Sequence, residues 1–120
     1  MDVWNEARKL VTNVYTATKV FPKDELFGIT NQIRRCAVSI PSNIAEGCGR
    51  NHIKDSMQFF YIARGSLYEL ETQLFVSCDL SYIDDATKQD LLKQLEIVRK
   101  LLSGFIKYYN SLTKQTPDNP

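Results

Sequence analysis

Histidine is almost missing from this chain of 120 residues, since His52 is the single one. One imidazole excludes the H-E-x-x-H zinc site and the E-x-x-H pairs of di-iron bundles, because each of these sites needs two histidines. The sequence also lacks the G-x-x-x-x-G-K phosphate loop and the G-x-S-x-G nucleophile elbow. We therefore expect no catalytic residues, no metal ion and no cofactor.

Cysteine is sparse and has no metal-site pattern: Cys36, Cys48 and Cys78 are an odd number and contain no C-x-x-C pair. Such a set excludes a disulfide framework and a zinc ribbon, and buried reduced thiols are the ordinary state of free cysteines. Cys48 and His52 are four residues apart, so a thiolate-imidazole pair is one alternative. The two flank an expected helix break and no third group orients the histidine, so we favour two unrelated side chains.

Long apolar runs are missing as well, because no stretch approaches the roughly 18 residues that cross a bilayer. Asp2, Asn5 and Glu6 stand where a signal peptide would be basic and then apolar. These two features predict a cytoplasmic protein without membrane contact. The length of 120 residues suits a single domain with its own core.

A strong excess of one charge is also missing: 15 Lys and Arg residues against 14 Asp and Glu residues leave a net charge of +1. The distribution is less even. Residues 34–64 hold five basic and two acidic residues, whereas residues 65–85 hold five acidic residues and no Lys or Arg. This pattern is typical of a bundle with separate basic and acidic surfaces, which can meet copies of itself or an anionic partner.

Apolar residues recur at alternating spacings of three and four in four segments, which is the periodicity of amphipathic helices. The segments are residues 3–19, 22–47, 52–78 and a last one that begins at 84 or 85. Short connections make consecutive helices antiparallel neighbours, so the pattern predicts an all-α, antiparallel up-down-up-down four-helix bundle over residues 1–113. Residues 114–120 contain two prolines and no apolar anchor, and we expect a disordered tail.

Polar and conformationally special residues predict where these helices begin and end. Asp2 is the expected N-cap of the first helix, and the second is expected to open at Pro22. Gly47 and Gly49 are expected to supply the left-handed conformation that ends the second helix, and Asn51 to cap the third.

Pro41 interrupts the apolar pattern of the second segment. An interior proline removes one helix hydrogen bond, at about 3 kcal/mol in an isolated helix. We therefore expect a proline-kinked second helix, and Ser39, Ser42 and Asn43 are the side chains available to stabilise the kink.

The first and third helices carry more apolar side chains than one buried stripe needs. Gly65 and Ser66 add a small pair at which another helix can approach closely. A bundle of this size cannot bury every apolar residue, and the surplus indicates a subunit interface. The surplus residues are Trp4, Val11, Tyr15, Phe59, Tyr61 and Tyr68.

Two motifs carry a family resemblance: QIRRCAVSIPSNIAEG at residues 32–47 and IARGSLYELETQL at residues 62–74. In this order and separation they resemble the bacterial four-helix-bundle family encoded within large-subunit rRNA intervening sequences. The resemblance implies a ring-like homopentamer and kinship with the accessory protein of diversity-generating retroelements, which binds a reverse transcriptase and nucleic acid. It implies no catalytic residues. Those accessory proteins are strongly basic, whereas this chain carries +1.

The motif residues are expected to be structural, although three of them are carboxylates open to another interpretation. Glu46, Glu69 and Glu71 fit either acid-base or metal chemistry, or ion pairs with arginines that join the second helix to the third. We favour ion pairs with Arg34, Arg35 or Arg64, within one subunit or between two. The full set is Pro41, Ser42, Asn43, Glu46, Gly47, Gly65, Glu69 and Glu71.

Basic residues near the junction of the second and third helices are candidates for phosphate contact, with aromatic neighbours as stacking platforms. A solvated junction that keeps the protein soluble is the alternative. Arg34 and Arg35 point about 100° apart on a helix, so one is expected to be structural and the other available to a partner. The candidates are Arg34, Arg35, Arg50, Lys54 and Arg64.

Two functions remain open at this point. The first is a non-enzymatic homo-oligomer, a pentamer by resemblance, that acts as an adaptor or chaperone for RNA, DNA or a nucleic-acid-processing protein. The second is a structural scaffold that holds a protein partner through the acidic residues 65–85 and does not bind nucleic acid.

Overall fold

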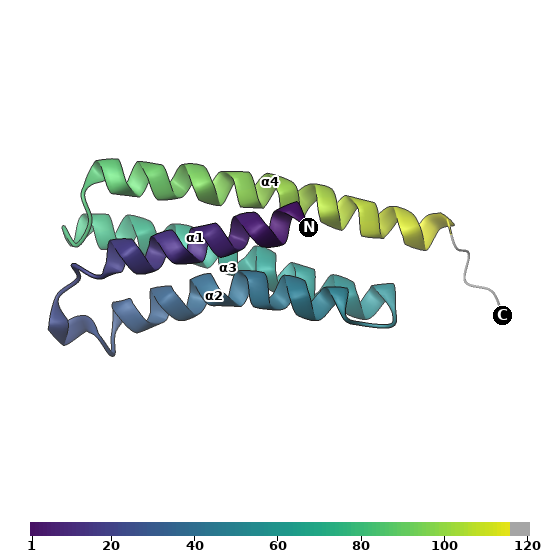
Figure 1. Ribbon diagram of the computed structural model, residues 1–120, viewed down its shortest axis with the longest axis horizontal. Coiled ribbons are helices and arrows are strands. Elements are labelled where there is room, and N and C mark those ends of the chain that lie inside the picture. The colour runs from purple at the N-terminus through teal and green to yellow at the C-terminus, as the bar shows by residue number, and fades with distance from the viewer. Residues whose placement is uncertain (116–120) are drawn as a thin grey trace.

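The computed structural model describes residues 1–115, with side chains described through Thr113. Four α-helices and one short 3-10 turn build an elongated bundle (Figure 1), and no strand occurs in the part of the chain described. The all-α, four-helix prediction is confirmed. The elements are α1 (Asp2–Thr18), the turn η1 (Lys23–Glu25), α2 (Ile29–Cys48), α3 (Ile53–Asp79) and α4 (Asp85–Gln115).

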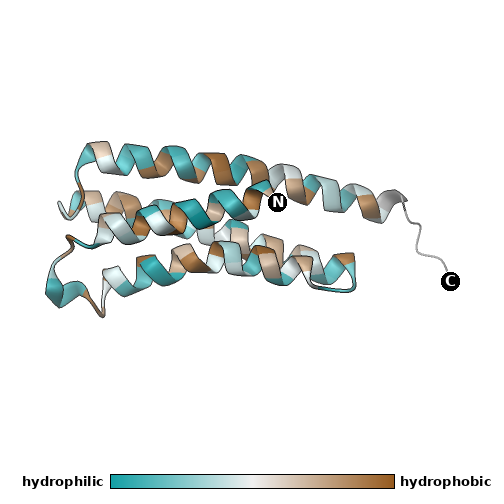
Figure 2. Cartoon of the chain, in the orientation of Figure 1, coloured by the Kyte–Doolittle hydropathy of each residue, from teal (hydrophilic) through white to brown (hydrophobic). Residues whose placement is uncertain are grey.

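The helices pack around one shared core. α1 contacts α2 and α4, and α3 contacts the same two helices, so α1 and α3 lie diagonally opposite. In Figure 1 each helix begins at the end of the bundle where the preceding one finishes, and α4 extends past the start of α1. Figure 2 shows apolar residues recurring along all four helices between hydrophilic ones, as amphipathic helices require.

Buried side chains follow the predicted stripes. On α2, Ile33, Ile40 and Ile44 are fully buried, and both Cys36 and Ala37 lie in the core. Burial of each large apolar side chain stabilises the fold by about 1.5–3 kcal/mol. The core residues of α3 and α4 are Met57, Phe60, Ala63, Leu67, Leu70, Leu74, Leu91, Leu95, Val98, Leu102 and Ile106.

The second helix begins at Ile29 and not at Pro22, so this prediction is wrong. Pro22 precedes η1, and Gly28 then adopts φ −106° and ψ −122°, outside the helical region. An added Cβ at Gly28 would lie 2.5 Å from Oε1 of Glu25, so the turn closes against the glycine. The Tyr82 hydroxyl donates to Oε2 of Glu25 at 2.7 Å. A side chain far along the sequence therefore helps to fix this turn.

Three predicted helix ends are also wrong. Met1 is the N-cap of α1, while Asp2 lies in its first turn. Gly49 follows α2 with φ −87°, and no glycine of the described residues has a positive φ. His52 rather than Asn51 is the N-cap of α3, and no side chain caps that end.

Gly47 allows a close approach of helices instead of a left-handed turn. It is buried, and an added Cβ would lie 2.9 Å from the carbonyl oxygen of Ser56 and against the ring of Phe60. Gly65 is the opposite case: it is exposed, and an added Cβ meets nothing within 4 Å. Of the small pair Gly65 and Ser66, the close approach occurs at Ser66, which is buried with its hydroxyl 2.7 Å from that of Ser39 on α2, and not at Gly65.

α2 continues through Pro41 as one helix. Nδ2 of Asn43 donates to the Ser39 carbonyl oxygen at 2.8 Å, and Oγ of Ser39 donates to the Cys36 carbonyl oxygen at 2.6 Å. Two of the three side chains expected to support the proline thus bind backbone carbonyls next to it, while Ser42 is exposed. The kink itself stays a prediction.

The C-terminal helix is longer than predicted. α4 ends at Gln115 and so includes the first two residues of the expected tail 114–120, while residues 116–120 lie outside the described part. Among the helices described, none has both the length and the apolar character of a membrane span.

Candidate nucleic-acid interface

The five basic candidates lie at separate places on the bundle. Arg34 and Arg35 are in the first half of α2, Arg50 follows α2, and Lys54 and Arg64 belong to α3. Arg35 and Arg50 are 15 residues apart in sequence, which corresponds to about 20 Å of helix. The candidates therefore do not form one continuous basic face.

Arg34 joins α2 to α1. Its Nε donates to Oγ1 of Thr18 at 2.8 Å, and its Nη2 lies 3.5 Å from the carbonyl oxygen of Tyr15. The guanidinium also stacks over the Tyr15 ring, 4.7 Å from its centroid. These contacts make Arg34 a structural residue of the α1–α2 pair.

Arg35 is exposed and borders an open hollow of about 470 Å³ that also touches Glu69 of α3. The polar groups of the hollow bind one another: the hydroxyls of Ser39 and Ser66 are 2.7 Å apart, and the Cys36 thiol donates to the Ser66 carbonyl oxygen at 3.2 Å. Arg35 has no carboxylate partner among residues 1–113. Its guanidinium is therefore available to an external anion, although the nearby Glu69 weakens the attraction.

The Arg50 guanidinium already has a carboxylate and an aromatic ring as partners. Its Nη2 lies 3.0 Å from Oε2 of Glu46, and its guanidinium stacks over the Phe59 ring at 4.5 Å. Both Arg50 and Glu46 are exposed, so the pair contributes little stability. It does neutralise the charge that a phosphate would meet.

Lys54 and Arg64 come together around Tyr61. The Arg64 guanidinium stacks over the Tyr61 ring, 4.9 Å from its centroid. Lys54 and Tyr61 both line a cleft of about 850 Å³ between the start of α3 and the end of α4. Neither cation has a carboxylate partner within the described chain. This end of α3 is therefore where unpaired positive charge and an aromatic ring coincide.

The predicted ion pairs between α2 and α3 do not form within the chain. Glu46 binds Arg50, and Glu69 accepts a hydrogen bond from Gln73 at 3.4 Å. Every ion pair among residues 1–113 joins side chains three or four positions apart. The prediction is wrong for a single chain, because Glu46 and Glu69 bind residues four positions along the sequence and Glu71 has no ion pair among residues 1–113. Pairing between subunits stays a prediction.

The thiols are not set up for nucleophilic chemistry. Burial, together with the nearby Glu69 carboxylate, raises the pKa of Cys36 to about 12. Partial burial of the sulfur also raises the pKa of Cys48, whose thiol lies 3.8 Å from Sδ of Met1 and has no hydrogen bond to His52 in the described structure. Nucleophilic cysteines need a lowered pKa. No group of three metal-binding side chains gathers within the described residues either.

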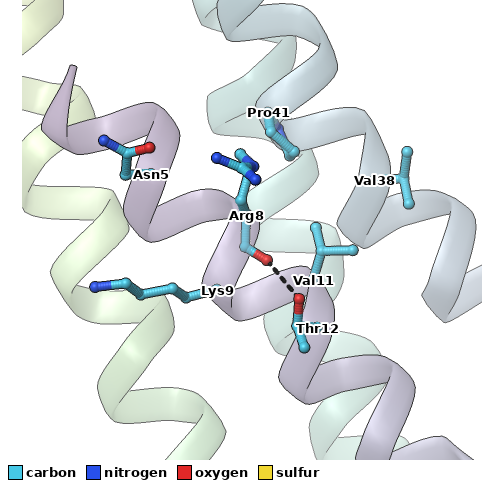
Figure 3. Close-up of a pocket in the computed structure, with 7 residues that line it drawn as sticks. All are labelled: Asn5, Arg8, Lys9, Val11, Thr12, Val38 and Pro41. Carbon is cyan, nitrogen blue, oxygen red and sulfur yellow. Dashed lines mark hydrogen bonds between the residues drawn. The ribbon is translucent and has the colours of Figure 1, made fainter.

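A third hollow lies between α1 and α2 and was not predicted from the sequence. Figure 3 shows Arg8 and Val11 of α1 on one side of it and Val38 and Pro41 of α2 on the other; its volume is about 580 Å³. The Arg8 guanidinium stacks over the Trp4 ring at 4.5 Å. The sequence contains a signal for this contact, because Arg8 lies one helical turn after Trp4.

These features define a four-helix-bundle protein with cations stacked on partly exposed aromatic rings. The chain belongs to the 23S rRNA-intervening sequence protein family, which matches residues 1–104, and the resemblance seen in the sequence is confirmed. It is similar to a solved protein of unknown function from the S23 ribosomal protein family of Bacteroides thetaiotaomicron. The two share 23% identity and a TM-score of 0.80 over 88% of this chain and 98% of that chain, which supports a common fold. No curated protein matches the chain.

Proposed function

We propose that this protein is a non-enzymatic, homo-oligomeric bundle that associates with nucleic acid as an adaptor or chaperone. The observation that carries the proposal is a row of aromatic side chains on α3. Tyr61, Tyr68 and Phe75 are seven residues apart and have exposed fractions of 43%, 53% and 46%. Side chains at this spacing share one face of a helix, and an exposed apolar face of this kind marks an interaction surface.

Two glycines support self-association. Gly65 and Gly104 are exposed positions inside long helices, and an added Cβ at either would meet nothing within 4 Å. Glycine inside a helix costs about 1 kcal/mol relative to alanine, and no contact within the chain offsets this cost. A neighbouring copy that approaches these positions closely would account for them. The family resemblance supports five copies.

Cations beside these rings support nucleic-acid binding. Arg64 stacks over Tyr61, and Nζ of Lys88 lies 4.9 Å from the centroid of Phe75. Single-stranded nucleic acids bind surfaces that combine basic groups with aromatic rings. Lys88 is paired with Asp85 at 3.1 Å, so the unpaired positive charge lies near Tyr61.

A binding titration against structured RNA and duplex DNA at several salt concentrations tests the proposal. The wild-type protein is expected to bind more weakly as salt rises, because phosphate contacts release counterions. The variant with Arg35, Lys54 and Arg64 all changed to alanine removes the three candidates without a carboxylate partner among the described residues, and is expected to lose most of this salt-sensitive binding.

A matched control removes the same charge elsewhere. Lys93, Lys100 and Lys107 are exposed and follow each other at seven-residue intervals on α4. Their triple alanine variant lowers the net charge equally and is expected to bind nearly as the wild type does. Equal loss in both triple variants would mean nonspecific attraction and would contradict the assignment of the face.

The rival function is a scaffold that holds a protein partner. It is favoured by the exposed apolar side chains of Phe75, Val76 and Leu80, which lie beside Asp79 at the end of α3. Absence of nucleic-acid binding even at low salt would favour this rival over the proposal.

A further inference from the structure

The cleft between the start of α3 and the end of α4 is lined by Lys54, a cation without an ion-pair partner in the described part of the chain, and is larger than the other hollows described above. Its volume of about 850 Å³ lies in the range of small-molecule sites. Its lining comes from the turn between α2 and α3, the first turns of α3 and the last part of α4. Its lining is Asn51, His52, Ile53, Lys54, Met57, Gln58, Tyr61, Asn110 and Thr113.

The side chains of this lining favour an anionic ligand over a cationic one. It contains no carboxylate, and its charged group is Lys54, which has no ion-pair partner among the described residues. Asn51, Gln58 and Asn110 each offer both a hydrogen-bond donor and an acceptor. Such a set attracts an anion and can also bind the polar edge of a planar ring.

Tyr61 supplies an aromatic wall. The Arg64 guanidinium covers the ring at 4.9 Å, while the tyrosine also lines the cleft. A cation held on a tyrosine in this way leaves positive charge at the edge of the site and a ring for stacking. Ile53 and Met57 add apolar surface to the same lining.

We propose that this cleft binds one nucleotide unit, with its phosphate at the Lys54 ammonium group and its base against Tyr61. The inference deepens the proposed function and rests on it where the nucleotide is part of an RNA strand. A free nucleotide has the same chemistry, so the test includes both sources.

The test follows the fluorescence of 2-aminopurine, which is quenched when the base stacks on an aromatic ring. One probe is 2-aminopurine riboside monophosphate, and the other is a short single-stranded RNA that carries one 2-aminopurine. Both are titrated with the full chain. Y61L is expected to weaken binding about tenfold and to abolish quenching, because it removes the stacking ring. Y61F keeps the ring and is expected to bind as the wild type does.

Two matched controls separate the cleft from general surface effects. Y108L changes an exposed tyrosine of α4 that lies neither in the cleft lining nor in the aromatic row of α3, and is expected to leave quenching unchanged. K54Q is expected to lower the dependence of log K on log salt by about one unit, whereas K100Q is not.

The outcomes distinguish the cleft from the wider proposal. Unchanged quenching in Y61L would overturn the cleft assignment, even if the triple charge variant still loses RNA binding. If the wild-type protein quenches the mononucleotide and Y61L does not, the cleft assignment is supported, even if structured RNA and duplex DNA fail to bind.

Discussion

Replacement of Gly47 by alanine should destabilise the bundle. The added methyl group would lie 2.9 Å from the carbonyl oxygen of Ser56 and 2.8 Å from Cδ1 of Phe60. The Phe60 ring cannot move away easily, because it is fully buried between Phe105 and Tyr109, with ring centroids 5.0 Å and 4.8 Å away. The methyl group therefore has to displace either a backbone segment or a packed aromatic cluster.

The magnitude follows from two opposing effects. Overpacking of a closed core costs about 1–3 kcal/mol, and the better helix propensity of alanine returns up to about 1 kcal/mol. A net loss of about 1–2 kcal/mol is expected for G47A. For a chain of this size that loss lowers the melting temperature by about 4–8 °C. Urea and thermal unfolding followed by far-ultraviolet circular dichroism measure both quantities.

G65A is the matched control, because it makes the same chemical change where nothing lies within 4 Å. It should stabilise the isolated chain by about 0.5–1 kcal/mol through helix propensity alone. Measurement at low protein concentration separates chain stability from assembly. A G47A variant as stable as the wild type would refute the account of the closed α2–α3 contact.

Three further predictions concern other parts of the bundle. P41A should reduce the mass of the assembly in solution more than the helix content, and an unchanged sedimentation coefficient would count against this. Oδ1 of Asp84 accepts from the Thr87 amide at 2.8 Å. Hydrogen bonding by the Thr87 side chain, and then by this amide, lowers the pKa of Asp84 below its ordinary 3.8. The resulting stability is present above about pH 4 and disappears as the pH falls through the lowered pKa. D84A should therefore melt at a lower temperature than the wild type at neutral pH and at the same temperature in acid. A difference in melting temperature that does not change with pH would contradict the assignment. Native Cys36, with its pKa raised to about 12, should resist iodoacetamide at pH values where exposed Cys48 reacts, and equal labelling by mass spectrometry would show that Cys36 is accessible.

Periodicity predicted the helices and the core because burial depends on which face of a helix a residue occupies. On α3 the apolar residues Ala63 and Leu70 are fully buried, while their polar neighbours Arg64 and Glu71 are exposed and half-buried. A polar side chain at these positions remains at least partly exposed to water, because its burial without a partner costs free energy.

Helix ends were harder to predict because their causes lie far away in sequence. The break before α2 involves Glu25, which is bound by Tyr82, 57 positions along the chain. The sequence indicated that a glycine matters at position 47, but it predicted a left-handed turn, whereas the structure requires glycine there because the Phe60 ring of the next helix packs against it. Local propensity does not contain such contacts.

The sequence predicted individual residues of the candidate interface but not their arrangement. Lys54 and Arg64 were identified by charge, and Tyr61 by its surplus of apolar surface. Their meeting depends on helical geometry and on the end of α4, which contributes Asn110 and Thr113 to the cleft. A sequence pattern cannot show that residues from α3 and α4 line one hollow.

Native mass spectrometry of the purified protein, with and without a short RNA, tests the central claim most directly, because a single spectrum reports both subunit number and bound RNA. We predict an assembly of several chains, five by family resemblance, that gains the mass of RNA at low salt and loses it as salt rises. A spectrum that contains only the mass of one chain, with no RNA adduct at any salt concentration, would contradict the account.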